Sequence, residues 1–100
     1  MYLEIADIDV KPGEEEAFEH GVRQAAPLFL RARGCHGVEL HRTVETPSLY
    51  KLMVTWETVE DHMVHFRNSE DFQEWRRLTS PHFAAPPRVV HTTKILQEAE

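Results

Sequence analysis

Apolar and polar residues follow a definite order of strand-like and helix-like patterns along the chain. Residues 2–10 are rich in aliphatic side chains and stop at the sequence KPG, which predicts a strand followed by a turn. From Glu14 the apolar residues recur every three or four positions, acidic residues crowd the first turn, and RARG follows as an end signal. This predicts a helix, and Pro27 within it predicts a kink or a break just before the proline.

The middle of the chain predicts a hairpin. Residues 38–44 and residues 50–56 both alternate apolar with polar side chains, and the turn sequence ETPS lies between them. Thr58 then stands where a helix N-cap belongs, with Asp61 in the capping-box position. A short helix is therefore expected, and it carries one apolar stripe formed by Val59, His62, Met63 and Phe66.

The last third predicts one more helix and one more strand. Asn68 or Ser69 can cap a helix whose apolar members are Phe72, Trp75 and Leu78, and SPHFAAPPR ends it. Residues 88–96 then read as a strand before a polar tail.

The order β-α-β-β-α-β, with its second helical position split in two, predicts a fold class. It is that of an α+β, ferredoxin-like split βαβ fold, with a four-stranded antiparallel sheet covered by helices on one face. We expect one domain over residues 1–100, with its core at about 2–96. The bare face would carry Leu3, Ile5, Leu52, Val54 or their neighbours among charges, so a homodimer burying sheet against sheet is expected.

Composition narrows the possible partners and compartments. The 100 residues carry 17 acidic against 11 basic side chains, a formal charge of −6, which argues against binding nucleic acid. Cys35 is the single cysteine, so no intramolecular disulfide can form. No apolar run approaches the roughly 18 residues of a membrane helix, and the N-terminus has no basic start. A cytoplasmic protein without a membrane partner is expected.

Several sequence motifs, taken in order, resemble the antibiotic biosynthesis monooxygenase domain family, a branch of the dimeric α/β barrels. They are VKPGEEEAFE, GCHGVELHRTVETPSLYKLMVTWE, a histidine six residues after that tryptophan, SEDFQEW and PHF. The resemblance covers residues 3–95. It implies ferredoxin-like halves paired as a dimeric α/β barrel, and a fold of this kind does not by itself fix an activity.

The resemblance also implies a chemistry. Family members with known activity oxidise polyphenolic or quinol-like substrates with dioxygen and without a metal, flavin or nicotinamide. A tryptophan closing the third strand and a polar side chain six residues later line their pocket, and Trp56 and His62 match those positions. A related branch degrades haem, but its strand-one asparagine is missing here, and Trp75 or Arg76 stands at its histidine position.

Cofactor-free oxygenation requires a base that ionises the substrate in a site closed to bulk water. His62 is the candidate base, because an imidazole is largely neutral at pH 7 and can accept a proton. The candidate substrate-binding residues are Trp56, Phe66, Phe72, Trp75 and Arg76. Each has a plainer interpretation: a hydrogen-bonded core histidine, packed aromatics and a surface charge.

Two further points concern the ionisable residues. His62 and His65 stand three residues apart, but no third ligand is recognisable and the other histidines are dispersed, so no metal is expected. Glu4 and Asp7 have opposite strand parity, so one of them should point inward, where it can orient His62 or Arg42.

The leading hypothesis is thus a homodimeric monooxygenase of small aromatic or quinol-type substrates that uses no cofactor. The alternatives are a non-catalytic ligand-binding dimer, a haem-binding protein, and a lactone isomerase of the kind found among other dimeric α/β barrels.

Overall fold

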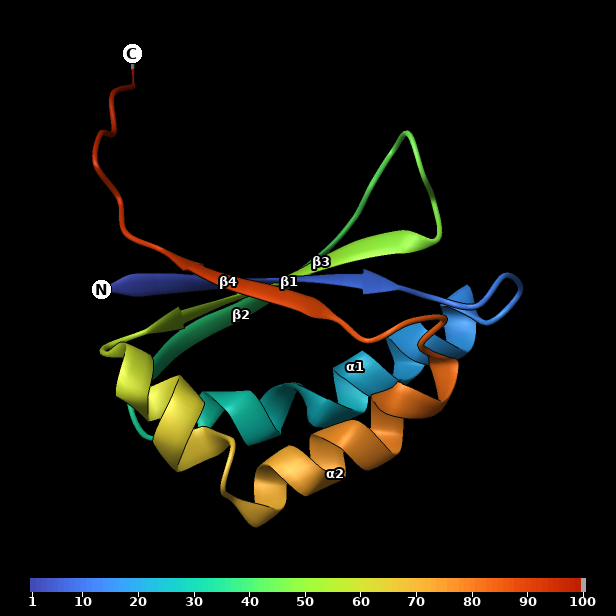
Figure 1. Cartoon of the computed structure of the whole chain (residues 1–100), viewed down its shortest axis with the longest axis horizontal. Coiled ribbons are helices and arrows are strands. Elements are labelled where there is room, and N and C mark those ends of the chain that lie inside the picture. The colour runs from blue at the N-terminus through green and yellow to red at the C-terminus, as the bar shows by residue number, and fades with distance from the viewer. Residues whose placement is uncertain (100) are drawn as a thin grey trace.

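The computed structural model describes residues 1–99 and has the expected order of elements (Figure 1). The elements are β1 (Tyr2–Asp9), α1 (Glu15–Leu30), β2 (Cys35–Arg42), β3 (Leu49–Trp56), the π-helix η1 (Asp61–Phe66), α2 (Glu70–Thr79), the 3₁₀ turn η2 (Ser80–His82) and β4 (Arg88–Thr92). The strands form one antiparallel sheet in the order β2-β3-β1-β4. The predicted α+β ferredoxin-like fold is confirmed.

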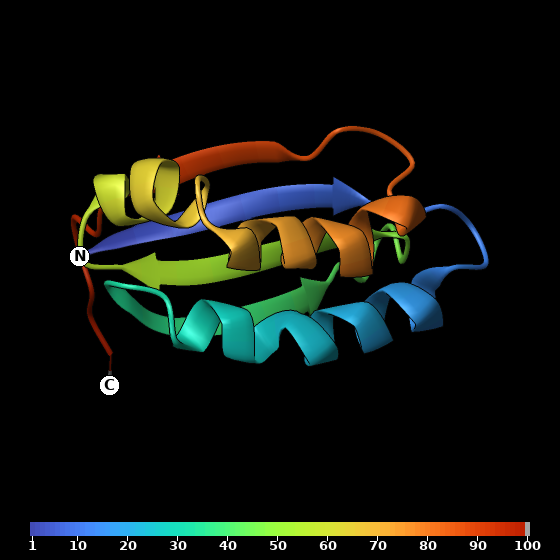
Figure 2. The ribbon, with the colours of Figure 1, turned by 90° about the horizontal axis from the view of Figure 1, so that it is seen from below.

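All of the helices lie on one face of the sheet (Figure 1). Seen from the helical side, α1 follows the β2 and β3 side, whereas η1 and α2 follow the other side, toward β1 and β4 (Figure 2). We call these regions the α1 half and the cavity half. The two helices α1 and α2 also contact each other, because Gly21 leaves room there; a Cβ atom at this position would overlap the carbonyl oxygen of Leu78.

Strand register decides which side chains the helices cover. Along β1 the buried positions alternate, and they include Glu4, which lies opposite Val54 on β3. Leu52 and Val54 therefore face the helices, so their assignment to the bare face was wrong. The register instead places Met53 and Val90 on either side of Ile5 on the bare face.

The sequence predicted a kink or a break near Pro27, and the break does not occur, since helix α1 passes through Pro27 and continues to Leu30. Hydrogen bonding resumes directly beyond the proline, since the amide of Arg31 donates to the Pro27 carbonyl over 3.1 Å. Only one helical donor is lost, and the buried side chains of Leu28 and Phe29 hold the last turn against the core.

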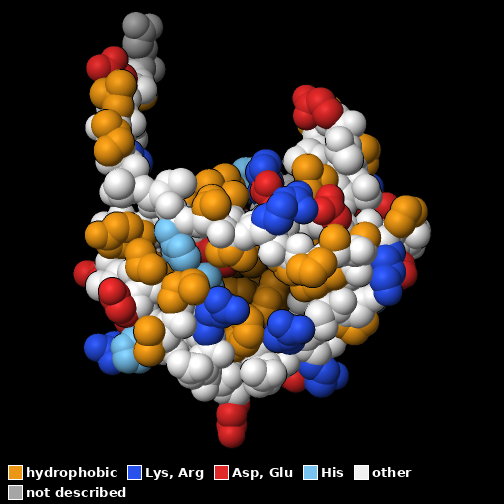
Figure 3. All heavy atoms as spheres, viewed as in Figure 1, with side chains coloured by type: hydrophobic (Ala, Val, Ile, Leu, Met, Phe, Trp, Pro, Cys, Tyr) orange, Lys and Arg blue, Asp and Glu red, His pale blue; other side chains and the backbone are white. Residues whose placement is uncertain are grey.

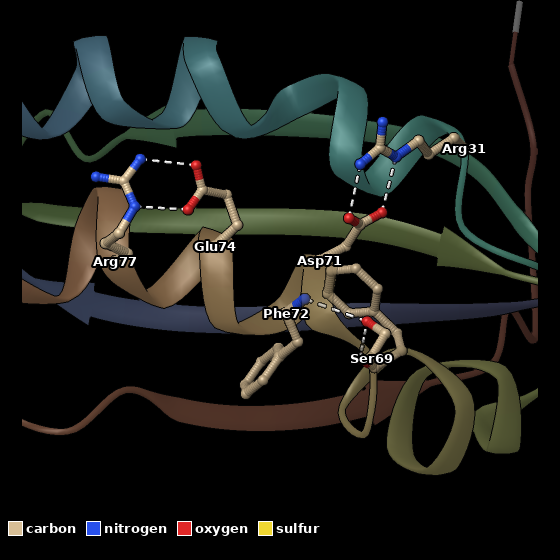
Figure 4. A network of polar contacts seen from close by, with 7 residues as sticks. Arg31, Ser69, Asp71, Phe72, Glu74 and Arg77 are labelled. Carbon is tan, nitrogen blue, oxygen red and sulfur yellow. Dashed lines mark hydrogen bonds and ion pairs between the residues drawn. The ribbon is translucent and has the colours of Figure 1, made fainter.

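The predicted capping residues hold the helix starts after β3. The Thr58 hydroxyl accepts a hydrogen bond from the Asp61 amide, and the Ser69 hydroxyl accepts one from the Phe72 amide, each over 3.1 Å. Figure 4 shows the second of these caps beside Asp71, whose carboxylate accepts hydrogen bonds from two guanidinium nitrogens of Arg31, Nη2 at 2.6 Å and Nε at 2.7 Å. This pair ties the end of α1 to the start of α2.

The last strand is shorter than predicted, because it ends at Thr92 rather than Leu96. Thr92 pairs with Leu3 near the start of β1, so the residues that follow have no strand beside them. They run away from the sheet (Figure 1), and Ile95 is 90% exposed. Within residues 1–99, no helix has the length and apolar character needed to cross a membrane.

Candidate functional site

The cavity half contains a cavity of about 800 Å³, which is within the size range of small-ligand sites. Figure 3 shows it as a hollow with hydrophobic side chains inside, basic side chains at its rim and histidines beside it. The walls come from the sheet, η1, α2 and the segment before β4. Their large apolar members are Phe29, Leu52, Phe66, Phe72, Trp75 and Phe83.

The π-helix η1 sets the orientation of two wall residues. The amide of Arg67 donates to the carbonyl of His62 over 3.0 Å, a bond that spans five residues and widens the turn. His62 and Phe66 are both buried, four residues apart on the same wall of the cavity. Single π turns occur frequently at functional sites, because they re-aim side chains without ending the helix.

Glu4 brings a carboxyl group into this apolar region. Its side chain faces the helices from the middle of the sheet and is only 4% exposed. The Trp56 indole N–H donates to Glu4 Oε1 over 2.9 Å, and His62 Nε2 lies 3.4 Å from the same oxygen. Burial raises the pKa of Glu4 to about 7, although the Trp56 bond and the positive charge of Arg67 oppose the rise.

The two histidines lie directly beside this carboxyl group. His62 Nδ1 is 2.8 Å from Nε2 of His91, so one of these nitrogens donates its hydrogen to the other. The imidazole of His62 also stacks on Trp56, with ring centres 5.3 Å apart. Burial lowers the pKa of His62 to about 4, helped by positive charge on His91 and Arg67, and burial also lowers the pKa of His91. Both rings are therefore neutral at pH 7.

We refer to Glu4, Trp56, His62 and His91 as the Glu4 cluster. The fold assembles it from β1, β3, η1 and β4, whose residues are far apart in sequence. It has a carboxyl group that titrates near neutrality beside two neutral imidazoles, at the wall of a cavity. Chemically, such a cluster can accept and return a proton.

The structure brings together most of the site residues expected from the sequence. His62, Phe66, Phe72, Trp75 and Arg76 all line the cavity. Trp56 does not line the cavity, because its ring is fully buried behind Glu4 and His62. There its N–H donates a hydrogen bond to Glu4, and its ring stacks on His62.

Two residues of the cluster were not singled out by the sequence pattern. The inward acid was left open between Glu4 and Asp7, and His91 was counted among the dispersed histidines, whereas the fold places it 2.8 Å from His62. The register of the strands would have identified both residues, since Glu4 of β1 pairs directly with His91 of β4. His65, which lies three residues from His62, is exposed, and residues 1–99 include no group of three or more His, Cys, Asp or Glu side chains arranged to hold a metal ion.

Arginines at the cavity differ from those elsewhere. Six of the eight have a carboxylate oxygen within 4.0 Å, namely Arg23, Arg31, Arg33, Arg42, Arg77 and Arg88. The other two, Arg67 and Arg76, line the cavity, and in the part of the chain that the structure describes no carboxylate pairs with them. The cavity therefore has two cationic groups available to a ligand.

Fold and cavity together define a ferredoxin-like α+β protein with a cavity of about 800 Å³ between its sheet and its helices. Residues 1–78 match the family model described as antibiotic biosynthesis monooxygenase. The chain belongs to this family, as its motifs indicated.

Three similar proteins illustrate the relationship. The chain is 38% identical to the uncharacterized protein YczJ of Bacillus subtilis over 91 residues, which is 91% of this chain and 96% of that protein. A crystal structure from Bordetella bronchiseptica, called a "putative antibiotic biosynthesis monooxygenase", is 61% identical and superposes with a TM-score of 0.94, covering 95% of this chain and 97% of that one. A protein of the same description from Nitrosomonas europaea has 22% identity and a TM-score of 0.81 over 96% and 100% of the two chains, and shares the fold.

Proposed function

We propose that the protein is a cofactor-independent monooxygenase that oxidises a small aromatic or quinol-type substrate with dioxygen. The observation that carries this proposal is the cavity itself, whose aromatic walls meet a cluster of proton-accepting groups. Family membership and the names of similar proteins support the same reaction class.

The proposed chemistry needs only a proton acceptor and an apolar enclosure. Removing a proton from a phenol, or from a CH₂ group activated by neighbouring rings, creates an electron-rich anion that reacts with dioxygen. For a CH₂ substrate, one oxygen atom ends in a new C=O group and the other leaves as water. The substrate supplies all four electrons that reduce dioxygen, so no further reductant is required.

The residues have separable roles in this proposal. His62, the polar residue at the cavity wall that the sequence singled out, takes part in proton transfer, and Trp56 supports it from behind. Phe66, Phe72 and Trp75 stack on the substrate ring, and Arg76 stabilises its anion. These groups are positioned before substrate arrives, which lowers the cost of organising them during the reaction.

Oxygen consumption by the metal-free protein tests this function. The panel comprises hydroquinones, anthrones and flavonols, with His62→Ala as the control for spontaneous oxidation. We expect uptake above background that falls on the order of 100-fold in the variant, the size of one general acid or base contribution. If no panel member is consumed while ligands still bind, the protein is a binding module rather than an oxygenase.

We also propose a homodimer formed through the bare face of the sheet. Apolar residues of three adjacent strands share that face, with Ile5 between Met53 and Val90, and Val90 is 56% exposed. A second copy would cover these side chains. Sedimentation equilibrium should show a dimer that Ile5→Asp dissociates; a wild-type monomer at micromolar concentration would contradict the proposal.

A further inference from the structure

We propose that the carboxylate of Glu4, rather than the imidazole of His62, is the base that receives the substrate's proton, and that His62 and His91 are positioning residues that hold it. This inference rests on the proposed function and assigns its proton transfer to one atom. It follows from which nitrogen and oxygen atoms of the cluster are already engaged.

Both nitrogens of His62 lie close to other groups of the cluster. Nδ1 is 2.8 Å from His91, and Nε2 is 3.4 Å from Glu4 Oε1. The whole side chain is 6% exposed, so a ligand in the cavity meets its ring mainly as a wall. To act as the base, His62 would have to break its hydrogen bond to His91 or receive the proton on Nε2, directly beside the Glu4 carboxyl group.

Glu4, in contrast, has one engaged oxygen and one free oxygen. Oε1 accepts from Trp56 and faces His62, whereas no described residue donates to Oε2. Within residues 1–99, however, no buried side-chain oxygen or nitrogen lacks a hydrogen-bond partner. Oε2 is therefore not sealed in the core, and it reaches the cavity that Glu4 lines.

The charged and titratable groups around Glu4 favour a proton that is held and released near neutral pH. His62 and Arg67 approach it from η1, His91 from β4 and Cys35 from β2, and Arg76 of α2 lines the same cavity. Burial raises the pKa of Glu4 to about 7, and the nearby Arg67 limits that rise. Glu4 and His62 can share one proton in two ways: as a carboxylic acid beside a neutral imidazole, or as a carboxylate beside an imidazolium. Burial favours the first state, because neither group is then charged.

The proposed step balances without any added group. Oε2 takes a proton from the substrate, which leaves a neutral carboxylic acid and a substrate anion. The anion bonds to dioxygen to form a peroxide, and Glu4 returns the proton to its outer oxygen. For a CH₂ substrate, loss of the second hydrogen with cleavage of the O–O bond then gives the C=O group and water.

Infrared spectroscopy of the unliganded protein tests where the proton lies, independently of turnover. At pH 6 ordinary carboxyl groups are ionised, so the C=O stretch of a protonated acid should report Glu4 alone. We expect this band to disappear with a midpoint near pH 7 and to be missing in Glu4→Gln. A spectrum without the band at pH 6 would mean that Glu4 is already ionised there, and it would overturn the inference.

Kinetics with an accepted substrate test the role of the same carboxyl group. Glu4→Gln should lower kcat/KM on the order of 100-fold and remove the rise in rate around pH 7, and Glu4→Asp should restore part of both. His62→Gln, which keeps a hydrogen-bonding side chain, should cost roughly 10-fold and shift the midpoint of the pH profile. Asp7→Asn is the matched control, because Asp7 lies on the same strand, faces away from the cavity and pairs with Lys51; it should change neither.

The possible failures are distinguishable. If Glu4→Gln keeps the wild-type rate and pH profile while His62→Gln loses them, the base is His62 and the monooxygenase function stands. If the wild type consumes no dioxygen, the proposed function fails, and the infrared titration still decides whether Glu4 holds the proton.

Discussion

The α1 half and the cavity half of the sheet bury side chains of different kinds. Under α1, Phe18 and Val54 are fully buried, and Phe18 packs on Tyr50 with ring centres 4.9 Å apart. The one polar atom of Tyr50 reaches Glu19 near the edge, 2.5 Å away. Under η1 and α2, by comparison, Glu4 and His62 are as buried as core residues but adjoin a cavity.

This difference separates the source of stability from the source of chemistry. Apolar burial in the α1 half favours folding directly. Burying the Glu4 cluster instead costs free energy, because a carboxyl group and two imidazoles lose water and are only partly compensated by each other. Such a cost is the usual accompaniment of a site whose pKa values are set for a reaction. The α1 half must supply the stability that the cavity half does not.

The largest expected effect comes from truncating the α1 half. Phe18→Ala should lower the free energy of unfolding by about 3–5 kcal/mol, because the vacated volume is enclosed on all sides. Phe72→Ala, its counterpart at the partly exposed wall of the cavity, should cost less than half as much. Denaturant unfolding of both variants measures the difference. Equal losses would mean that the two halves contribute alike to stability.

The pH dependence of stability sharpens the comparison within the cavity half. Folding raises the pKa of Glu4 from 4.5 to about 7. The stability that this carboxyl group gains from the shift is therefore fully present below pH 4.5 and is lost as the pH rises through 7. Folding lowers the pKa of His62 from 6.5 to about 4, so its contribution is present above pH 6.5 and lost as pH falls through 4. In the wild type the two trends oppose each other.

Single variants should separate these trends. Relative to the wild type, the unfolding free energy of Glu4→Gln should rise by about 3 kcal/mol from pH 4.5 to 7. That of His62→Gln should fall by about 2 kcal/mol from pH 4 to 6.5, a smaller change because part of the pKa shift of His62 comes from the charges of His91 and the exposed Arg67, which solvent screens. Urea unfolding across this range measures both. Parallel curves for the three proteins would show that neither pKa changes on folding.

The same contrast explains how much the sequence could predict. Elements and fold followed from local patterns, since alternation in 50–56 and helical spacing after Glu14 depend on residues close in sequence. The capping hydroxyls of Thr58 and Ser69 were also local signals, and both form the expected bonds. Pro27 did not break its helix, because packing compensated for one missing donor.

The Glu4 cluster could not be predicted from local sequence patterns, because its members come from four elements that are far apart in the sequence. His62 was found from the apolar stripe of a helix and the family resemblance, but its contact with His91 depends on how β4 aligns with β1. The choice between Glu4 and Asp7 likewise depends on register, which a shift of one residue would reverse. A register derived from the fold class would have placed Glu4 opposite His91.

The smallest predicted effect concerns the unpaired arginines at the cavity, and adjacent residues provide the comparison. Arg76 lines the cavity without a carboxylate partner, whereas Arg77 is bound by Glu74 through two contacts of 2.6 and 2.7 Å (Figure 4). Arg76→Gln should weaken binding of an anionic aromatic probe, anilinonaphthalene sulfonate, by about fivefold, as expected for an exposed ion pair of about 1 kcal/mol. Arg77→Gln should leave that affinity unchanged, and fluorescence titration at low salt measures both. Equal weakening by the two variants would mean that the probe responds to the overall surface charge and not to the cavity.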